Sequence, residues 1–284
     1  MHYRAHWIGI LRISKEKLER HFDREDFDLS SFAWTVAEEY GIDSDRVVIK
    51  KVGERKTYAP LADPNLFFSF ARLASRGRPS DISVLRWVSK YGLPKQKDED
   101  SLLNLPNGEL NQASAPIDEL VAEALEAHSG LNLHADLSIG DIESLRRRIR
   151  KLREDSERWK QLSKLDEKLV KDWGHEADGY RGSNLPWMAE VELAVFIRRK
   201  VESVRLDLAG SGYFDPSANG YNPTASWSCT DLFSAMYLQF YLLIVNDLPM
   251  RRCKNPPCKM AFPLTRKNKW FCDSTCRSNM RHYR

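Results

Sequence analysis

Four cysteines near the end of the chain are the residues whose type and spacing best suit chemistry. They follow the pattern Cys253-x4-Cys258-x13-Cys272-x3-Cys276, which gives two close pairs separated by a longer loop. Two such pairs can bring four thiolates around one ion, and zinc favours tetrahedral sulfur coordination. Four cysteine ligands leave no open position, so we expect one structural Zn²⁺. Two disulfides, or four unrelated reduced cysteines, are the open alternatives.

The remaining cysteine usage and the N-terminus indicate a reducing compartment. Cys229 lies apart from the other four and is expected to be a small buried hydrophobic residue. Residues 1–22 contain only a short apolar stretch and no small-residue cleavage site, which is not the pattern of a secretory signal. No apolar run approaches the ~18 residues that suggest a membrane span. We therefore expect a cytoplasmic protein without membrane contact.

Positive charge is concentrated around the four paired cysteines. Residues 251–284 hold ten basic residues and one acidic residue, which leaves 34 basic and 39 acidic residues in the first 250. After Cys272 the sequence predicts a short helix beginning near Asp273 or Ser274, with arginines recurring at i, i+4 and i+7 on one face. Such a surface favours contact with nucleic-acid phosphates, and double-stranded DNA is the expected partner. The candidate contacts are Arg266, Lys267, Lys269, Arg277, Asn279, Arg281 and Arg284.

Other interpretations of this basic end stay open. A solvated tail that aids solubility would have a similar composition. RNA binding would depend on aromatic stacking more than on insertion into a groove. The cysteine module could also be a folding staple or a protein-interaction module, in which Phe262, Trp270 or Phe271 would cover the basic face or dock a partner.

The module resembles the CGNR zinc fingers found at the C-terminus of bacterial proteins described as stress-induced transcription regulators. The resemblance rests on the two cysteine pairs, an aromatic residue with a proline after the second cysteine, an aromatic pair before the third, and the arginine-rich end. The residues concerned besides the cysteines are Phe262-Pro263 and Trp270-Phe271.

The resemblance implies a fold, a ligand set and a function. The family's four metal ligands correspond to the four paired cysteines, and its finger follows an α-rich N-terminal domain. The tetrad that names the family is Cys-Gly-Asn-Arg, whereas this chain has Cys276-Arg277-Ser278-Asn279. This departure argues against a base-reading role for the asparagine, whereas the four expected metal ligands are unchanged. The function implied is that of a bacterial transcription regulator.

The elements that must position this module are expected to be mostly helical. Strand patterns are confined to the N-terminal part, and Gly53 marks the turn of the expected hairpin. The last predicted helix before the cysteines is apolar nearly all round, which is typical of a buried core helix. The sequence predicts a strand at 5–13, a hairpin at 46–61, and helices at 28–42, 62–74, 79–92, 139–172, 185–210 and 230–247.

The predicted fold class is mainly α with a small N-terminal β element: a helical body followed by a small C-terminal zinc finger of treble-clef or ribbon type. A small molecule or protein signal could act on the helical body. The apolar stripe of the 139–172 helix is expected to pack on its own domain, with a coiled-coil arm and a homodimer as the alternative. The predicted segments are an α/β-to-helical region at 1–93, a linker or mobile loop at 94–116, a helical body at 117–250 that forms one domain with the first region, and a four-cysteine zinc finger at 251–284.

No motif in the sequence indicates an enzyme. The segment "AGSGYF" contains a lone Gly-x-Gly that follows no clear strand. The segment "WGHEADGYRG" at 173–182 groups a histidine with two acids, but without the i, i+4 histidine spacing of a helical metal site. We interpret it as a polar loop between helices. The sequence singles out no nucleophile, and catalysis is not predicted.

Overall fold

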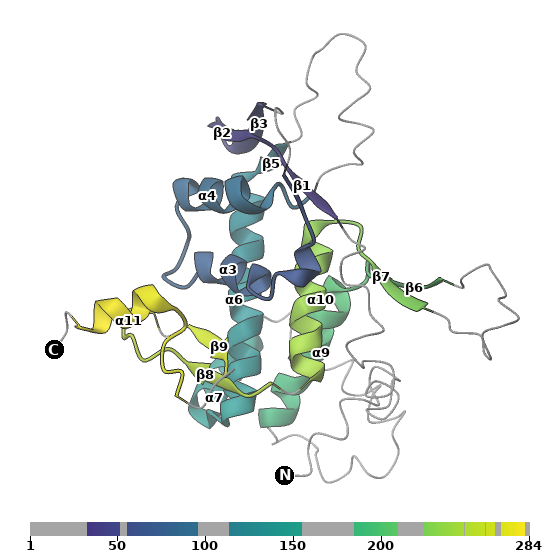
Figure 1. Ribbon diagram of the computed structural model, residues 1–284. Helices are drawn as coiled ribbons and strands as arrows, with labels where there is room; N and C mark the ends of the chain where they lie inside the picture. The colour runs from purple at the N-terminus through teal and green to yellow at the C-terminus, as the bar shows by residue number, and fades with distance from the viewer. Residues whose placement is uncertain are drawn as a thin grey trace, which may run out of the picture.

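Helices make up most of the structure, and small sheets lie at its edges (Figure 1). This arrangement confirms the mainly α prediction. None of the helices within the described ranges has the length and apolar character needed to cross a membrane. The computed structural model describes residues 33–51, 56–95, 114–154, 185–209, 224–246, 248–258, 260–264 and 268–281.

Strands occupy the N-terminal part where the sequence pattern had predicted a helix at 28–42. Within the described part of the chain, that prediction is wrong at residues 34–36 and 39–42, which belong to the strands β1 and β2. Trp34, Val36 and Tyr40 point into the core from these strands, and aromatic and β-branched residues suit such a half-buried pleated surface. The elements are β1 (Trp34–Val36), β2 (Glu39–Asp43), β3 (Arg46–Lys51), β4 (Lys56–Tyr58) and β5 (Ser114–Pro116).

The predicted hairpin at 46–61 consists of strands, but they do not pair with each other. β3 lies between β2 and β5 in a three-stranded antiparallel sheet, whereas β4 pairs with β1. The observed tight hairpin joins β2 to β3 through a two-residue turn after Asp43, and Ser44 in that turn has a φ of 56°. β5 corresponds to the last three residues of the predicted linker; residues 96–113 lie outside the described ranges.

One long helix, α6 (Ile117–Ile139), runs through the centre of the body (Figure 1). It contacts α3, α4, α7 and α9, and α10 packs against α3 and α9. The predicted helices at 62–74, 79–92 and 230–247 are confirmed as α3, α4 and α10. The other helices of the body are α3 (Leu66–Leu73), α4 (Asp81–Tyr91), α7 (Ile142–Glu154), α9 (Leu185–Lys200) and α10 (Leu232–Val245).

Two predicted helices have different ends in the structure. The helix predicted to begin at residue 139 begins as α7 at Ile142, where Asp141 caps it by accepting a hydrogen bond from Ser144 N–H at 3.0 Å. The preceding helix, α6, ends at Gly140, whose φ of 75° is in the left-handed region. The predicted 185–210 helix ends as α9 at Lys200. Its remainder forms β6 (Arg205–Ala209), which pairs with β7 (Thr224–Ser228).

Several predicted segments lie wholly or partly outside the described ranges. The strand at 5–13, the part of the 139–172 helix beyond residue 154, and the polar loop at 173–182 lie outside them. For residues 155–172, packing of the apolar stripe on its own domain therefore stays a prediction, with the coiled-coil arm as its alternative.

Aromatic packing joins α10 to the rest of the body. Phe240 stacks on Phe67 of α3 with ring centroids 4.5 Å apart and 9° between the planes. On the α6 side, Gly130 leaves room for the ring of Phe196, because a Cβ at that position would lie 2.6 Å from it. Since the core continues without a break into Met260 and Phe262 of the cysteine module, the module shares the core of the body.

Candidate metal centre

A short hairpin and a short helix hold the four cysteines. The hairpin consists of β8 (Met250–Arg252) and β9 (Ala261–Pro263), and the helix is α11 (Ser274–Arg281). One cysteine follows β8, the next lies in the turn that leads to β9, and the second pair flanks the start of α11. The predicted helix after Cys272 is confirmed. These elements lie beside α6, on the side away from α10 (Figure 1).

Hydrogen bonds from their own backbone N–H groups position three of the four cysteines. Cys253 N–H donates to the Met260 carbonyl at 2.9 Å, and Cys258 N–H donates to the Asn255 carbonyl at 2.9 Å. Cys276 N–H donates to a carboxylate oxygen of Asp273 at 2.7 Å, so Asp273 caps α11. The expectation that Asp273 lies at the helix start is therefore correct.

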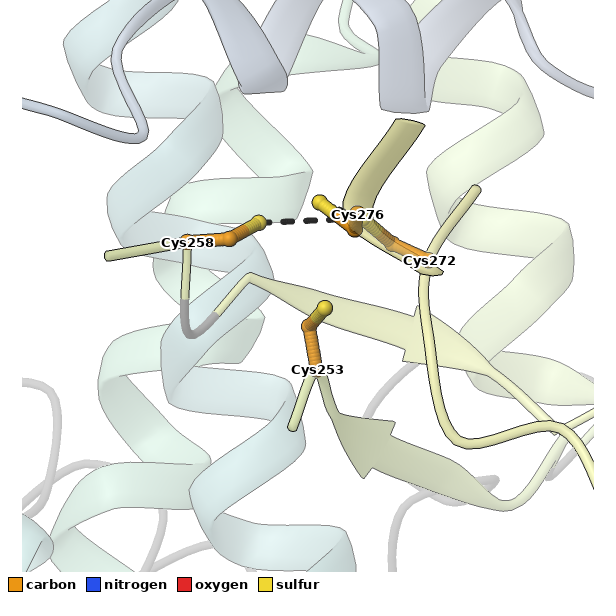
Figure 2. A group of neighbouring side chains, drawn as sticks. All are labelled: Cys253, Cys258, Cys272 and Cys276. Carbon is orange, nitrogen blue, oxygen red and sulfur yellow. Dashed lines mark hydrogen bonds between the residues drawn. The ribbon is translucent and has the colours of Figure 1, made fainter. Parts of the chain in front are cut away.

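The four side chains converge on one point (Figure 2). Their Sγ atoms all lie within 4.8 Å of one another, and Cys272 Sγ is 3.6 Å from Cys258 Sγ and 3.4 Å from Cys276 Sγ. A disulfide bond is about 2.05 Å long, and all four cysteines are free thiols. Metal–sulfur bonds of about 2.3 Å imply tetrahedral edges of about 3.8 Å. The cluster therefore has the dimensions of a site for a single metal ion.

Burial and hydrogen bonding shift the pKa values of the clustered cysteines. Cys253, Cys258 and Cys276 are buried, and Cys272 is half-buried. A hydrogen bond from the Cys272 thiol lowers the pKa of Cys258 to about 5, and the same bond raises the pKa of Cys272. Burial raises the pKa of Cys276. Because a metal needs all four sulfurs as thiolates, binding must release the protons that the cluster shares.

The side chain of Asn255 lies where it could act as the outer partner of a metal ligand. Its amide is fully buried, makes no conventional hydrogen bond within the described part of the chain, and opposes the rise in the pKa of neighbouring Cys276. Metal-bound ligands commonly take a hydrogen bond from such an outer group. A metal-held thiolate at Cys276 would be a stronger acceptor for this amide than a neutral thiol.

One arginine of the body reaches the centre. Arg72, near the end of α3, forms an ion pair with Asp273, and its Nη2 lies 3.9 Å from Cys276 Sγ. The same carboxylate thus caps α11 and holds α3. A cation beside a sulfur ligand also offsets the negative charge of a metal with four thiolates.

The cysteine module packs firmly on α6. Met260, Ala261 and Phe262 are almost completely buried. Arg252 forms an ion pair with the buried Asp136 of α6 and donates to Asn132 Oδ1 at 3.0 Å. The module is therefore docked on the body by apolar contacts and by two arginine-carboxylate pairs.

The predicted nucleic-acid contacts are only partly visible. Arg277 is exposed on α11, Asn279 on the same helix is half-buried, and half-buried Lys269 has its Nζ 5.2 Å from the Phe262 ring centroid. Arg281 ends α11, but its side chain is outside the described part. Arg266, Lys267 and Arg284 lie entirely outside it.

Two basic residues that the prediction omitted surround Trp270. The Arg251 guanidinium carbon lies 4.2 Å and Lys254 Nζ 3.7 Å from the Trp270 ring centroid, and Arg251 donates to the Lys269 carbonyl at 3.1 Å. Trp270 is 43% exposed, whereas Phe262 is buried and Phe271 half-buried. Part of the positive charge therefore makes contacts inside the module. The spacing of these residues in the sequence does not indicate those contacts.

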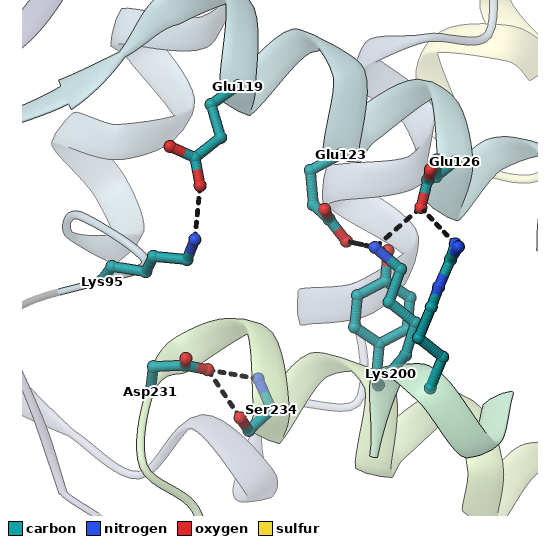
Figure 3. Close-up of polar contacts among 9 residues, drawn as sticks. Lys95, Glu119, Glu123, Glu126, Lys200, Asp231 and Ser234 are labelled. Carbon is teal, nitrogen blue, oxygen red and sulfur yellow. Dashed lines mark hydrogen bonds and ion pairs between the residues drawn. The ribbon is translucent and has the colours of Figure 1, made fainter. Parts of the chain in front are cut away.

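A second charged cluster lies in the body between α6, α9 and α10 (Figure 3). Lys200 forms ion pairs with Glu123 and Glu126, and Arg199 also pairs with Glu126. Tyr237 donates to Glu123 at 2.6 Å. Each charge in the cluster has a partner of opposite sign, so the cluster joins three helices.

Cys229 is buried away from the metal centre, as predicted. Burial raises the pKa of its thiol to about 12.

Comparison of the chain with protein-family models, curated proteins and solved structures finds no match.

Proposed function

We propose that this chain is a zinc-containing nucleic-acid-binding protein whose C-terminal finger contacts phosphates. The observation that carries the proposal is the convergence of four cysteine sulfurs directly beneath an exposed arginine-bearing helix. Sulfur atoms within 4.8 Å of one another leave room for one ion rather than a cluster, and soft thiolate ligands in tetrahedral arrangement favour zinc. The ion is structural, because no coordination position stays open.

The finger is of the treble-clef type in this proposal. Its first cysteine pair comes from the hairpin, and its second pair comes from the start of a helix rather than from a second hairpin. This arrangement supports a treble clef over a ribbon. It also places Arg277 one residue after a metal ligand, so a bound ion would hold the backbone at Arg277 in a fixed position relative to the body.

The partner is double-stranded DNA, and the role is that of a bacterial transcription regulator. Support comes from the excess of basic residues after position 250 and from the i, i+4 spacing of Arg277 and Arg281 on α11. The resemblance to CGNR fingers points the same way. A metal-held helix can present both guanidiniums to phosphates or base edges with little loss of backbone freedom on binding.

A salt titration of duplex binding tests this function. The zinc-loaded chain is expected to bind random duplex DNA with steep salt dependence, and the chelated chain to bind much more weakly. Replacing Arg277 and Arg281 together by alanine should weaken binding and reduce the salt slope by about 2, while zinc content stays unchanged. Arg86→Ala, on the exposed face of α4, is the matched control. Equal binding by the double variant and the wild type would rule out this surface.

The second candidate is a folding staple. It is favoured by the burial of Met260, Ala261 and Phe262 against the body, which a freely presented finger would not require. In that case chelation lowers the stability of the whole chain, and neither duplex DNA nor single-stranded RNA binds at low salt.

A further inference from the structure

Three arginines of the body face the same pocket as the metal centre. The pocket has a volume of about 380 Å³ and is formed by the end of α3, the following loop, the start of α4 and two of the cysteines. The lining includes no carboxylate. Its principal members are Arg72, Arg76, Arg78, Ser75, Cys258 and Cys276.

We propose that this pocket binds a phosphate group of the nucleic-acid backbone and thereby extends the nucleic-acid surface from α11 onto the α3–α4 loop. The inference rests on the proposed function, but it concerns residues outside the finger. It assigns Arg76 and Arg78 as phosphate-binding residues and Arg72 as the residue that joins their loop to the finger.

The local charge supports an anionic ligand. The first 250 residues contain more acidic than basic residues, yet residues 64–80 contain three arginines and no acid. Those three arginines are the ones that line the pocket. A cationic segment in an acidic body, placed beside the basic C-terminal module, suits a polyanion that spans both.

The three arginines differ in how far they are free to bind a ligand. Arg72 is committed to Asp273 and to the sulfur of Cys276, where it offsets the charge of the metal centre. Arg78 pairs with Asp118, but the side chains are 66% and 80% exposed, and such exposed pairs contribute little, so a phosphate can replace the carboxylate. Arg76 is exposed and has no ion pair within the described residues.

The pocket and the finger surface are continuous. Cys276 forms part of the pocket wall, and the next residue, Arg277, is exposed on α11. In Figure 1 the α3–α4 loop and α11 lie on the same side of the body. The N-terminus of α4 already has the negative charge of Asp81 in its first turn. A phosphate would therefore be stabilised by the arginines of the pocket and not by this helix end. A backbone held by Arg277 can therefore continue to Arg76 and Arg78.

The test combines two variants and two probes. The full zinc-loaded chain carrying Arg76→Ala and Arg78→Ala should bind a short duplex about tenfold more weakly at low salt, with a salt slope reduced by about 2. Arg86→Ala should bind like the wild type. Zinc content and thermal unfolding should not change in either variant, because the replaced side chains are exposed. Calorimetric titration with pyrophosphate gives a second probe of the same pocket.

The outcomes separate this inference from the proposed function. If Arg277→Ala weakens duplex binding and the Arg76/Arg78 variant does not, the pocket inference is wrong and the proposed function stands. If the wild type binds neither duplex nor pyrophosphate, both are wrong. If pyrophosphate binds through Arg76 and Arg78 but duplex does not bind, the proposed function fails and the pocket serves a free phosphorylated ligand.

Discussion

Arg72 of α3 and Asp273 of the cysteine module form an ion pair that links the helical body to the start of α11. The same carboxylate accepts a hydrogen bond from Cys276 N–H, and the same guanidinium lies 3.9 Å from Cys276 Sγ. One metal ligand is therefore held by both the finger and the body. This relationship predicts that metal retention depends on a residue 204 positions before that ligand in the chain.

Arg72→Ala is expected to speed metal release. It removes the cation beside Cys276 and leaves Asp273 without its partner, although the carboxylate keeps its role as helix cap. The side chains are 39% and 25% exposed, so we expect a loss of only about 1 kcal/mol in unfolding free energy. The rate of zinc transfer to a chromophoric chelator should rise several-fold. Arg72→Lys should recover part of the effect, because lysine keeps the charge but not the planar fork. An unchanged release rate would show that the pair does not stabilise the centre.

Cys276→Ser and Cys229→Ser form a matched pair that tests the metal site. The first variant loses one of four converging ligands and should hold less than one zinc per chain, whereas the second should hold one zinc like the wild type. Loss of a structural metal is among the most destabilising single changes, on the order of 4 kcal/mol or more. Elemental analysis and denaturant unfolding measure the two effects. Full zinc occupancy in Cys276→Ser would contradict the assignment of that ligand.

The convergence of the four cysteines was the feature that the sequence predicted best. Close pairs of cysteines impose local turns, so their spacing nearly determines the arrangement of the sulfurs. The short helix after Cys272 was also predictable, because its cap, Asp273, is adjacent in the chain. The apolar helix α10 was recognisable from its composition alone.

Long-range pairing was not predictable from the sequence. The segment 28–42 was predicted to be a helix, but pairing with β3 and β4 makes residues 34–36 and 39–43 strands. The sequence around Arg72 predicts only a helix, and no local pattern indicates that this arginine meets Asp273. The partners of Trp270 were likewise hidden, because Arg251 and Lys254 approach its ring only after the hairpin has formed.

Phe262→Ala and Trp270→Ala should separate docking of the module from its surface role. Phe262 is 3% exposed within the shared core, and its removal should cost about 3–5 kcal/mol. Trp270 is 43% exposed and contacts mainly the two cations, so its removal should cost about 1 kcal/mol. Thermal unfolding of the zinc-loaded variants measures the difference. Equal destabilisation by the two changes would show that the module is not docked through Phe262.

Glu123→Ala should destabilise the body far more than Glu119→Ala. Glu123 accepts from Tyr237 and pairs with Lys200, whose side chain is only 13% exposed (Figure 3). Removing the Glu123 carboxylate leaves the buried Tyr237 hydroxyl without its acceptor and takes away one of the carboxylates that pair with Lys200. The expected cost in unfolding free energy is about 3 kcal/mol. Glu119 pairs with Lys95 at the surface, where the loss should stay below about 1 kcal/mol. Urea unfolding at neutral pH compares the two, and a similar cost for both would refute the buried-network interpretation.

Cys229 should make the folded chain progressively less stable in alkali. Burial raises the pKa of its thiol from 9.0 to about 12, so between these values the unfolded chain has lost a proton that the folded chain keeps. Fewer bound protons in the unfolded state mean that the free energy of unfolding falls as pH rises, by up to about 1.4 kcal/mol per pH unit from this group. Cys229→Ala removes that contribution. Denaturant unfolding of the zinc-loaded wild type and variant between about pH 9 and 11 should therefore show a shallower decline for the variant, and parallel declines would mean that the thiol ionises alike in both states.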